Sequence, residues 1–262
     1  MRALDRLLTS PPDPARVGWL SQWTYAHRGF HGGEVPENTL LAFAAAADAG
    51  LGIECDIQRS ADGTAMVFHD WDLDRLIESQ GALGDQASDF LETLKYRGQE
   101  YGIARLVTLL ELVAGRVPVL IEIKSRPRYD IERSCAAVQA GLTGYEGLHA
   151  VMSFDPRVSR WFRRHSPQTV RGLVMREDAH GHTQSAWRRH MALWIARPEF
   201  VAYHVDALPN RFAADLRRRG FPMPSWTVDS AEKLATVRRY ADAAIAEGAG
   251  LEMASHRTAE TT

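Results

Sequence analysis

The sequence predicts an α/β fold in which eight strands alternate with helices. Short β-branched runs alternate with Ala- and Leu-rich stretches along almost all of the 262 residues, and the composition, 45% hydrophobic and 24% charged, is that of an ordinary globular protein. Eight such units predict a (β/α)₈ barrel, the TIM barrel, as a single domain from about residue 20 to 250 with short terminal tails. A doubly wound open sheet is the alternative, but no Gly-rich phosphate loop follows the first strand.

Each strand is expected where a short apolar run lies between turn signals, and each helix where Ala and Leu recur at helical spacing. The predicted strands are 23–27, 53–56, 117–123, 148–153, 169–174, 200–204, 223–228 and 243–246. The predicted helices are 40–49, 107–114, 131–140, 156–165, 187–196, 211–219 and 232–240. Asn38 and Thr39 cap the first helix, and Gly50 ends it. Residues 81–102 break the rhythm and are expected to form a loop or small insertion, while 254–262 are expected to be a frayed tail.

A β-hairpin arm is predicted at the mouth of the barrel. Asp62-Gly63 is a strong signal for a two-residue type I′ turn, because both residues tolerate a positive φ. Pairing outward from such a turn places Asp56 opposite His69. Glu54, two residues before Asp56, shares its face of the strand. The arm therefore predicts that two carboxylates and a histidine lie together.

Carboxylates also recur at the carboxyl ends of separate strands, where the active sites of (β/α)₈ barrels lie. Glu54 and Asp56 end the second predicted strand, and Glu122 ends the third. Three inward carboxylates are costly without a counter-charge, and Lys124 alone does not offset all three. An all-oxygen ligand set suits a hard ion. The pattern therefore predicts one divalent cation, Mg²⁺ or Ca²⁺, at Glu54, Asp56 and Glu122.

The neighbouring histidines and cations suit hydrolysis of a phosphate ester. His27 and His69 flank the carboxylates and are the predicted general acid and base, because imidazole titrates near neutral pH. Either histidine alone would more often be structural, and it is their occurrence together with the carboxylates that favours catalysis. Arg28 and Lys124 are expected to neutralise phosphate oxygens. Only three of the 31 basic residues are lysines, and Lys124 lies in an apolar run, which suggests a site that needs a compact ammonium.

Composition limits the partners and the compartment. A net charge of −2 offers no basic field for nucleic acid, and no apolar run approaches the roughly 20 residues of a membrane span. Cys55 and Cys135 are too few for a disulfide framework and are expected to be free buried thiols, so a cytoplasmic location is the expectation. The pair His180 and His182 is interpreted as a solvated loop. The expected partner is a small-molecule substrate, and the oligomeric state stays open.

At these residues the chain resembles the glycerophosphodiester phosphodiesterase family, of the PLC-like phosphodiesterase superfamily. The matching motifs are His27-Arg28-Gly29, Pro36-Glu37-Asn38-Thr39, Glu54-Cys55-Asp56, Asp62-Gly63, His69-Asp70 with Leu73 and Arg75, Glu122-Ile123-Lys124, Ser153-Phe154-Asp155 and Trp226-Thr227-Val228. The resemblance implies a TIM barrel that hydrolyses glycerophosphodiesters to an alcohol and glycerol phosphate with one divalent cation. The residue roles that it implies are metal binding by Glu54, Asp56 and Glu122, acid-base catalysis by His27 and His69, phosphate binding by Arg28 and Lys124, and a glycerol-side wall at Trp226.

The resemblance also implies a two-step route in which the glycerol 2-hydroxyl attacks phosphorus and water then opens the cyclic phosphate, with the histidines exchanging roles. A hydroxyl already attached to the substrate makes the first step intramolecular. The chain departs from the family at Asp229, where Asn is usual, and at Glu247, in a segment that replaces Thr-Asp-x-Pro. Two alternatives remain: a phospholipase D-like lyase that releases a cyclic phosphate, and a non-catalytic barrel that binds glycerophosphodiesters.

Overall fold

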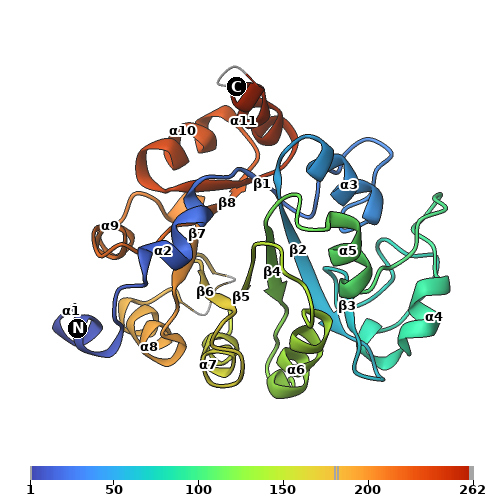
Figure 1. Cartoon of the computed structure of the whole chain (residues 1–262), viewed down its shortest axis with the longest axis horizontal. Helices are drawn as coiled ribbons and strands as arrows, with labels where there is room; N and C mark the ends of the chain where they lie inside the picture. The colour runs from blue at the N-terminus through green and yellow to red at the C-terminus, as the bar shows by residue number, and fades with distance from the viewer. Residues whose placement is uncertain (1, 180, 182, 260–262) are drawn as a thin grey trace. The chain divides into compact units, whose positions relative to one another are not determined.

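Strands and helices alternate along the chain in the computed structural model, which describes residues 2–179, 181 and 183–259 (Figure 1). Within the described residues, eight strands run parallel and each precedes a helix, which is the order of a (β/α)₈ barrel, so the predicted fold class is confirmed. The described residues form two compact units, one within residues 28–149 and the other within residues 2–27 and 150–259. A single catalytic domain stays a prediction. His180 and His182 lie outside the described residues.

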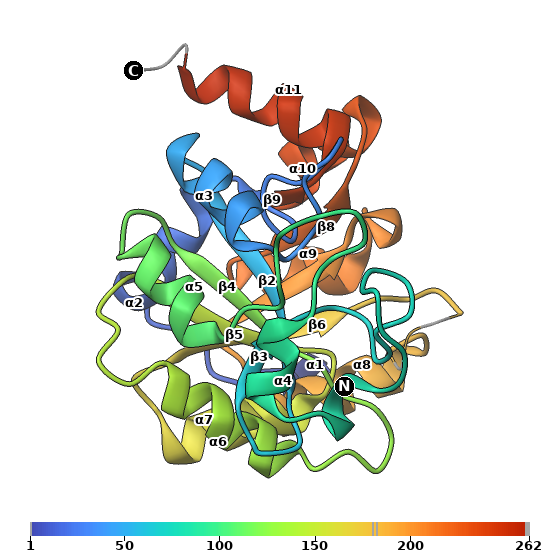
Figure 2. The same ribbon diagram turned by 90° about the vertical axis from the view of Figure 1, so that its right-hand side faces the viewer.

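The unit of residues 28–149 contains two parallel strands, one antiparallel strand and the helices that cover them. Its elements are α3 (Leu40–Asp48), β2 (Gly52–Arg59), β3 (Ala65–Val67), η2 (Leu83–Asp85), α4 (Ser88–Thr93), α5 (Leu106–Val113), β4 (Val119–Ile123) and α6 (Ile131–Gly141). Strand β2 pairs with β4 in parallel and with β3 in antiparallel, and Figure 2 shows β3 beside β2. Thr39 is the N-cap of α3, as predicted, and its side chain accepts from the Ala42 amide.

The other unit contains six parallel strands, which pair in the order β1, β9, β8, β7, β6, β5. Its elements are α1 (Arg2–Leu8), α2 (Pro14–Val17), η1 (Gly18–Ser21), β1 (Tyr25–Ala26), β5 (His149–Ser153), α7 (Pro156–His165), β6 (Val170–Met175), α8 (Ala186–Ala196), β7 (Phe200–His204), η3 (Val205–Ala207), α9 (Arg211–Arg218), β8 (Pro224–Val228), α10 (Ala231–Tyr240), β9 (Ala243–Ala246) and α11 (Gly248–Ala259). Helices α7 and α8 pack together (Figure 1), as do α10 and α11 (Figure 2). None of the helices in the described residues is long and apolar enough to cross a membrane.

The prediction of a frayed tail at 254–262 is wrong for the described residues, because α11 continues to Ala259. Its Ala-rich, Gly-containing composition resembles a tail, yet Leu251 and Ala254 are buried. The N-terminal segment is also structured. Asp5 of α1 is buried and accepts hydrogen bonds from His190 and Trp194 of α8, which anchor α1 to that helix.

The hairpin forms, but its predicted register is wrong by one residue. Phe68, and not His69, lies opposite Asp56, and the Phe68 amide donates to the Asp56 carbonyl at 3.0 Å. The cause is a three-residue loop, 61–63, that ends with Gly63 at φ +91° in place of the predicted two-residue turn. Because side chains alternate along a strand, a shift of one residue changes which face a neighbour occupies.

Residues 81–102 form a small packed insertion, with η2 and α4, and are not an open loop. A separate hydrophobic cluster holds them against β3. Its fully buried members are Met66, Phe68, Leu73, Ile77, Leu83, Leu91, Tyr96 and Ile103. Asp62 of the hairpin loop also accepts hydrogen bonds from the Ser88 amide (3.1 Å) and hydroxyl (2.6 Å). The insertion is therefore held by both apolar packing and hydrogen bonds.

Candidate active site

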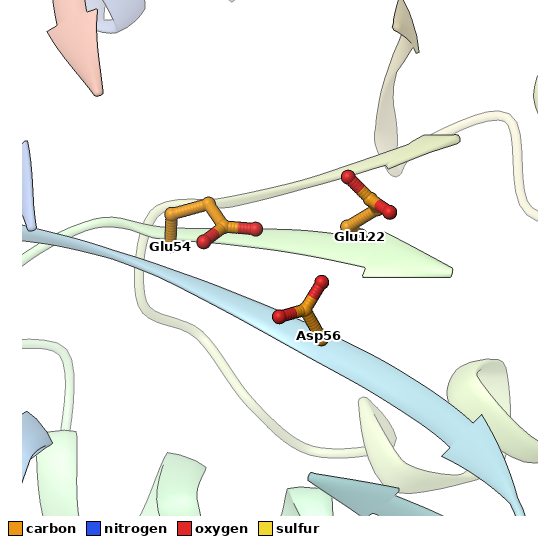
Figure 3. Close-up of side chains that lie close together, drawn as sticks. All are labelled: Glu54, Asp56 and Glu122. Atoms are coloured by element: carbon orange, nitrogen blue, oxygen red, sulfur yellow. The ribbon is translucent and has the colours of Figure 1, made fainter. Parts of the chain in front are cut away.

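Three carboxylates gather within the unit of residues 28–149, as predicted. Glu54 and Asp56 extend from β2 and Glu122 from β4, and Figure 3 shows their carboxylates turned toward one another. The parallel register places Asp56 directly beside Glu122. One ligand oxygen from each residue lies within 4.8 Å of the other two, and all three residues are at most 8% exposed. The alternation of side chains along β2 puts Glu54 and Asp56 on one face, which explains the cluster.

Two cations balance part of this charge. Lys124 Nζ lies 3.1 Å from Asp56 Oδ1 and 2.9 Å from Glu122 Oε1. Arg28 donates its backbone N–H to Glu54 Oε2 at 3.0 Å, and its Nε forms an ion pair with Asp56 Oδ2 at 3.2 Å without hydrogen-bond geometry. The three buried carboxylates still repel one another at these distances, which favours a positive charge among their oxygens.

The pKa shifts follow from burial and from like charges. Burial and the neighbouring carboxylates of Asp56 and Glu122 raise the pKa of Glu54 well above its usual range. Burial alone lowers the pKa of Lys124, but attraction to Asp56 and Glu122 outweighs burial, so its pKa is raised and the amine stays an ammonium. A divalent cation among these oxygens would relieve the repulsion that acts on Glu54. The donor set, three buried carboxylates and no sulfur or nitrogen, fits a hard ion.

The loop after β1 is built to hold this cluster. Asn38 adopts φ +57° and is buried. Its side-chain Nδ2 donates to Asp56 Oδ2 at 2.9 Å, and its Oδ1 accepts from the Asp56 backbone N–H at 3.2 Å. Gly29 has φ +84°, and a Cβ there would lie 2.8 Å from the Cβ of Ala42. Only glycine satisfies both conditions, because other residues rarely adopt this conformation. This loop therefore delivers the Arg28 amide to Glu54.

His69 joins the cluster through a chain of ion pairs and not as a cross-strand neighbour. Its Nδ1 lies 2.7 Å from Asp70 Oδ1, and Arg75 binds Asp70 through Nε at 2.5 Å. Arg75 Nη2 also donates to Glu37 Oε1 at 2.7 Å, and Arg28 Nη1 donates to the same oxygen at 2.9 Å. Burial alone raises the pKa of Asp70, but hydrogen bonds from Arg75 and His69 outweigh it and lower the pKa. Asp70 therefore stays ionised beside the imidazole.

His27, the last residue before the carboxylate-bearing unit, has a similar carboxylate partner. Its Nδ1 lies 2.5 Å from Glu247 Oε2, at the end of β9. A carboxylate at Nδ1 favours the tautomer with the proton on that nitrogen, which leaves the lone pair on Nε2. The departure of this chain from the family's usual closing motif thus keeps an acidic side chain at His27.

Trp226 lies in an aromatic group on the carboxyl ends of β5 to β8. Its ring packs edge-on against Phe154 (centroids 5.3 Å) and His204 (4.8 Å), and the Arg176 guanidinium lies 5.5 Å from its centroid. Burial lowers the pKa of His204, which favours a neutral ring. The group forms a partly buried aromatic wall. Asp229, where the family often has Asn, accepts from Lys233 Nζ at 2.8 Å.

The structure brings together most of the predicted site residues. Glu54, Asp56, Glu122, Lys124 and Arg28 are in direct contact or in one cluster. His27 and Trp226 belong to the other unit, where each has the partners described above. Sequence reasoning assigned no role in the site to the supporting residues Glu37, Asn38, Asp70, Arg75 and Glu247. Four of these belong to the motifs that carry the resemblance, and the motifs themselves were the available signal.

Known proteins match almost the whole chain. Residues 27–247 match the family model described as "Glycerophosphoryl diester phosphodiesterase family". A glycerophosphodiester phosphodiesterase of Caldanaerobacter subterraneus is 28% identical over 222 residues, which cover 80% of this chain and 86% of that protein. The solved structure of an Oleispira antarctica phosphodiesterase, in complex with the product sn-glycerol-3-phosphate, is 21% identical with a TM-score of 0.77 and covers 90% of this chain and 96% of that one. A Thermotoga maritima glycerophosphodiester phosphodiesterase structure is 25% identical, with a TM-score of 0.69 and coverage of 85% and 93%.

Proposed function

Because the chain belongs to the glycerophosphoryl diester phosphodiesterase family, we propose that it hydrolyses glycerophosphodiesters to an alcohol and glycerol phosphate with one divalent cation. The observation that carries this proposal is the buried trio of Glu54, Asp56 and Glu122, with ligand oxygens within 4.8 Å of one another. Three buried carboxylates this close repel one another, and a cation among their oxygens would relieve that repulsion.

The three carboxylates would hold Mg²⁺ or Ca²⁺, the hard ions that an all-oxygen set accepts. When bound, such an ion supplies positive charge to the phosphate oxygens as the reaction proceeds. Lys124 and Arg28 would contact the same phosphate, because both already lie at the carboxylate cluster. The guanidinium and the ammonium would then stabilise the negative charge that develops in the transition state.

His27 and His69 are the proposed acid and base. In the first step, the oxygen of the glycerol 2-hydroxyl attacks phosphorus while one imidazole takes the proton of that hydroxyl. The other imidazole gives a proton to the oxygen of the leaving alcohol. Water then opens the cyclic phosphate with the two roles exchanged. A carboxylate at each Nδ1, Glu247 for His27 and Asp70 for His69, would favour Nε2 as the nitrogen that exchanges protons.

Trp226 is proposed to wall the glycerol side of the pocket. Its ring already packs with Phe154 and His204, so its orientation is set by neighbours at the ends of other strands. An aromatic face suits the C–H face of glycerol.

The test is a substrate panel with Mg²⁺, Ca²⁺ and Mn²⁺, read out as release of glycerol phosphate. We expect turnover that His27→Ala and His69→Ala each reduce at least a hundredfold, since general acid-base catalysis contributes about 10²–10⁴-fold. Arg160→Met is a matched control, because Arg160 is exposed on α7 and lies outside the proposed site. Normal turnover by both histidine variants would refute the assignment of the acid and base.

Phosphorus NMR of the products separates the proposal from its two competitors. Glycerol phosphate as the final product supports hydrolysis. A cyclic phosphate that persists would assign the chain to the lyase chemistry, and tight binding without turnover under all three ions would assign it to the binders. A cytoplasmic location is also proposed, because the chain has only two cysteines, Cys55 and Cys135, too few for a disulfide framework. Fractionation of cells that express the full chain tests it.

A further inference from the structure

A cluster of arginines and aromatic rings lies outside the site described so far. It consists of Arg59, Trp71, Arg126 and Tyr129. The Arg126 guanidinium lies 4.5 Å from the Trp71 centroid and Arg59 lies 5.5 Å from the Tyr129 centroid, while the two rings pack edge-on at 5.2 Å. Arg126 is exposed and the other three are partly exposed; Arg128, also exposed, lies next to the cluster in the sequence.

The cluster lies on the segments that carry the proposed catalytic and phosphate-binding residues. Trp71 follows His69 by two residues, and Arg126 follows Lys124 by two residues. Two extended residues span at most about 7 Å. Arg59 is the last residue of β2, the strand that carries two of the three carboxylates. Both guanidiniums are therefore at the carboxyl-end side of the strands that build the candidate metal site.

No carboxylate of the described residues neutralises either guanidinium. Within the described residues, neither Arg59 nor Arg126 forms an ion pair with a carboxylate; Arg59 donates only to the Ser134 hydroxyl, at 3.4 Å. Two carboxylates lie near the cluster in the sequence. Asp70 forms an ion pair with Arg75, and Asp72 is exposed and forms no ion pair with either cluster arginine. Asp130 is the N-cap of α6 and accepts from a backbone N–H of that helix. The cluster thus presents positive charge with ordered planar geometry.

We propose that this cluster binds an anionic group on the alcohol half of the substrate, so that preferred substrates carry a second phosphate or carboxylate on the alcohol. The inference rests on the proposed function and deepens it. Every glycerophosphodiester has the same glycerol phosphate half, whose only anion is the scissile phosphate, so a second anion lies on the alcohol. A guanidinium held in place by stacking is suited to bind such an oxyanion in two-pronged fashion.

The same geometry disfavours a choline alcohol. Quaternary ammonium groups bind to open aromatic faces. Here Trp71 and Tyr129 each have a guanidinium against the ring, and that charge repels a second cation. The cluster therefore favours an anionic alcohol over a cationic one, whereas an aromatic cage favours the cation.

The experiment compares kcat/KM for three diesters whose alcohols are glycerol phosphate, glycerol and choline, each measured by loss of the diester resonance in phosphorus NMR. We expect the phosphate-bearing diester to exceed the choline diester by about tenfold at low salt. This ratio falls as NaCl is raised, because exposed charges are screened. Arg126→Met lowers the ratio of the phosphate-bearing to the neutral diester about tenfold, and Arg126→Lys, which keeps the charge, lowers it less.

Arg160→Met again serves as the matched control and leaves all three values unchanged. Equal or higher kcat/KM for the choline diester, or an Arg126→Met variant that lowers all three values by the same factor, overturns the inference while the proposed function stands. Failure of all three diesters to be cleaved by the unmodified protein is the distinct result that overturns the proposed function. Thermal midpoints measured in parallel show whether each variant is folded.

Discussion

Asn38→Ala is the substitution whose consequence follows most directly from the contacts of a single side chain. The side chain is 1% exposed and makes two hydrogen bonds to Asp56, of 2.9 Å to the carboxylate and 3.2 Å from the backbone N–H. Loss of the bond to a charged group costs about 1.5–3 kcal/mol and loss of the second about 0.5–1.5 kcal/mol. The positive φ of +57° adds about 1–2 kcal/mol, because alanine tolerates this conformation less well than asparagine.

The expected destabilisation is therefore about 3–6.5 kcal/mol, and at about 2–4 °C per kcal/mol for a chain of this size it lowers the thermal midpoint by roughly 6 °C or more. The assay is thermal unfolding in EDTA, so that metal binding does not contribute to the shift. Asn38→Gly is the matched control, since it loses the same hydrogen bonds but relieves the backbone strain. We expect its midpoint to lie above that of Asn38→Ala. A midpoint of Asn38→Ala within about 2 °C of the unsubstituted protein would refute the reasoning.

Three further predictions concern other contacts. Glu247→Gln removes the charge of the carboxylate at His27 Nδ1, so we expect kcat to fall about 10²-fold with KM nearly unchanged. Glu247→Asp, which keeps the charge, is expected to restore much of the rate. A fall in kcat accompanied by a rise in KM of the same factor would count against a positioning role. Gly29→Ala introduces a Cβ 2.8 Å from that of Ala42 at φ +84°, so a fall of at least about 5 °C in the thermal midpoint is expected. Burial lowers the pKa of His149 below its ordinary 6.5, so the unfolded chain binds the proton more readily than the folded chain does. The free energy of unfolding is therefore expected to fall as the pH drops below 6.5. In thermal midpoints measured at several pH values, His149→Gln should show a smaller decline.

The strands and most helices could be predicted because local periodicity determines them. The α7, β7 and β9 bounds match the prediction residue for residue, and other elements differ by a few residues at their ends. The hairpin register could not be predicted, since Asp62-Gly63 also fits a three-residue loop with glycine in the left-handed conformation. Helix α11 was missed because burial of Leu251 depends on tertiary packing that no local pattern reports.

The candidate site shows the same division. The carboxylate trio could be predicted because Glu54 and Asp56 alternate on one strand and Glu122 ends another. The chain of ion pairs from His69 through Asp70 to Arg75 could not be predicted, because it depends on side-chain contacts between segments and not on strand pairing.

We propose that the three buried carboxylates bind one divalent cation on which hydrolysis depends. The most direct measurement is a titration of Mg²⁺, Ca²⁺ or Mn²⁺ into EDTA-treated, dialysed protein, with heat of binding and release of glycerol phosphate followed on the same preparation. We expect no turnover before the ion is added and recovery of turnover that saturates at one ion per chain. In Glu122→Gln we expect loss of both the heat of binding and the release of glycerol phosphate. Full turnover in the presence of EDTA, or recovery that Glu122→Gln leaves intact, would contradict it.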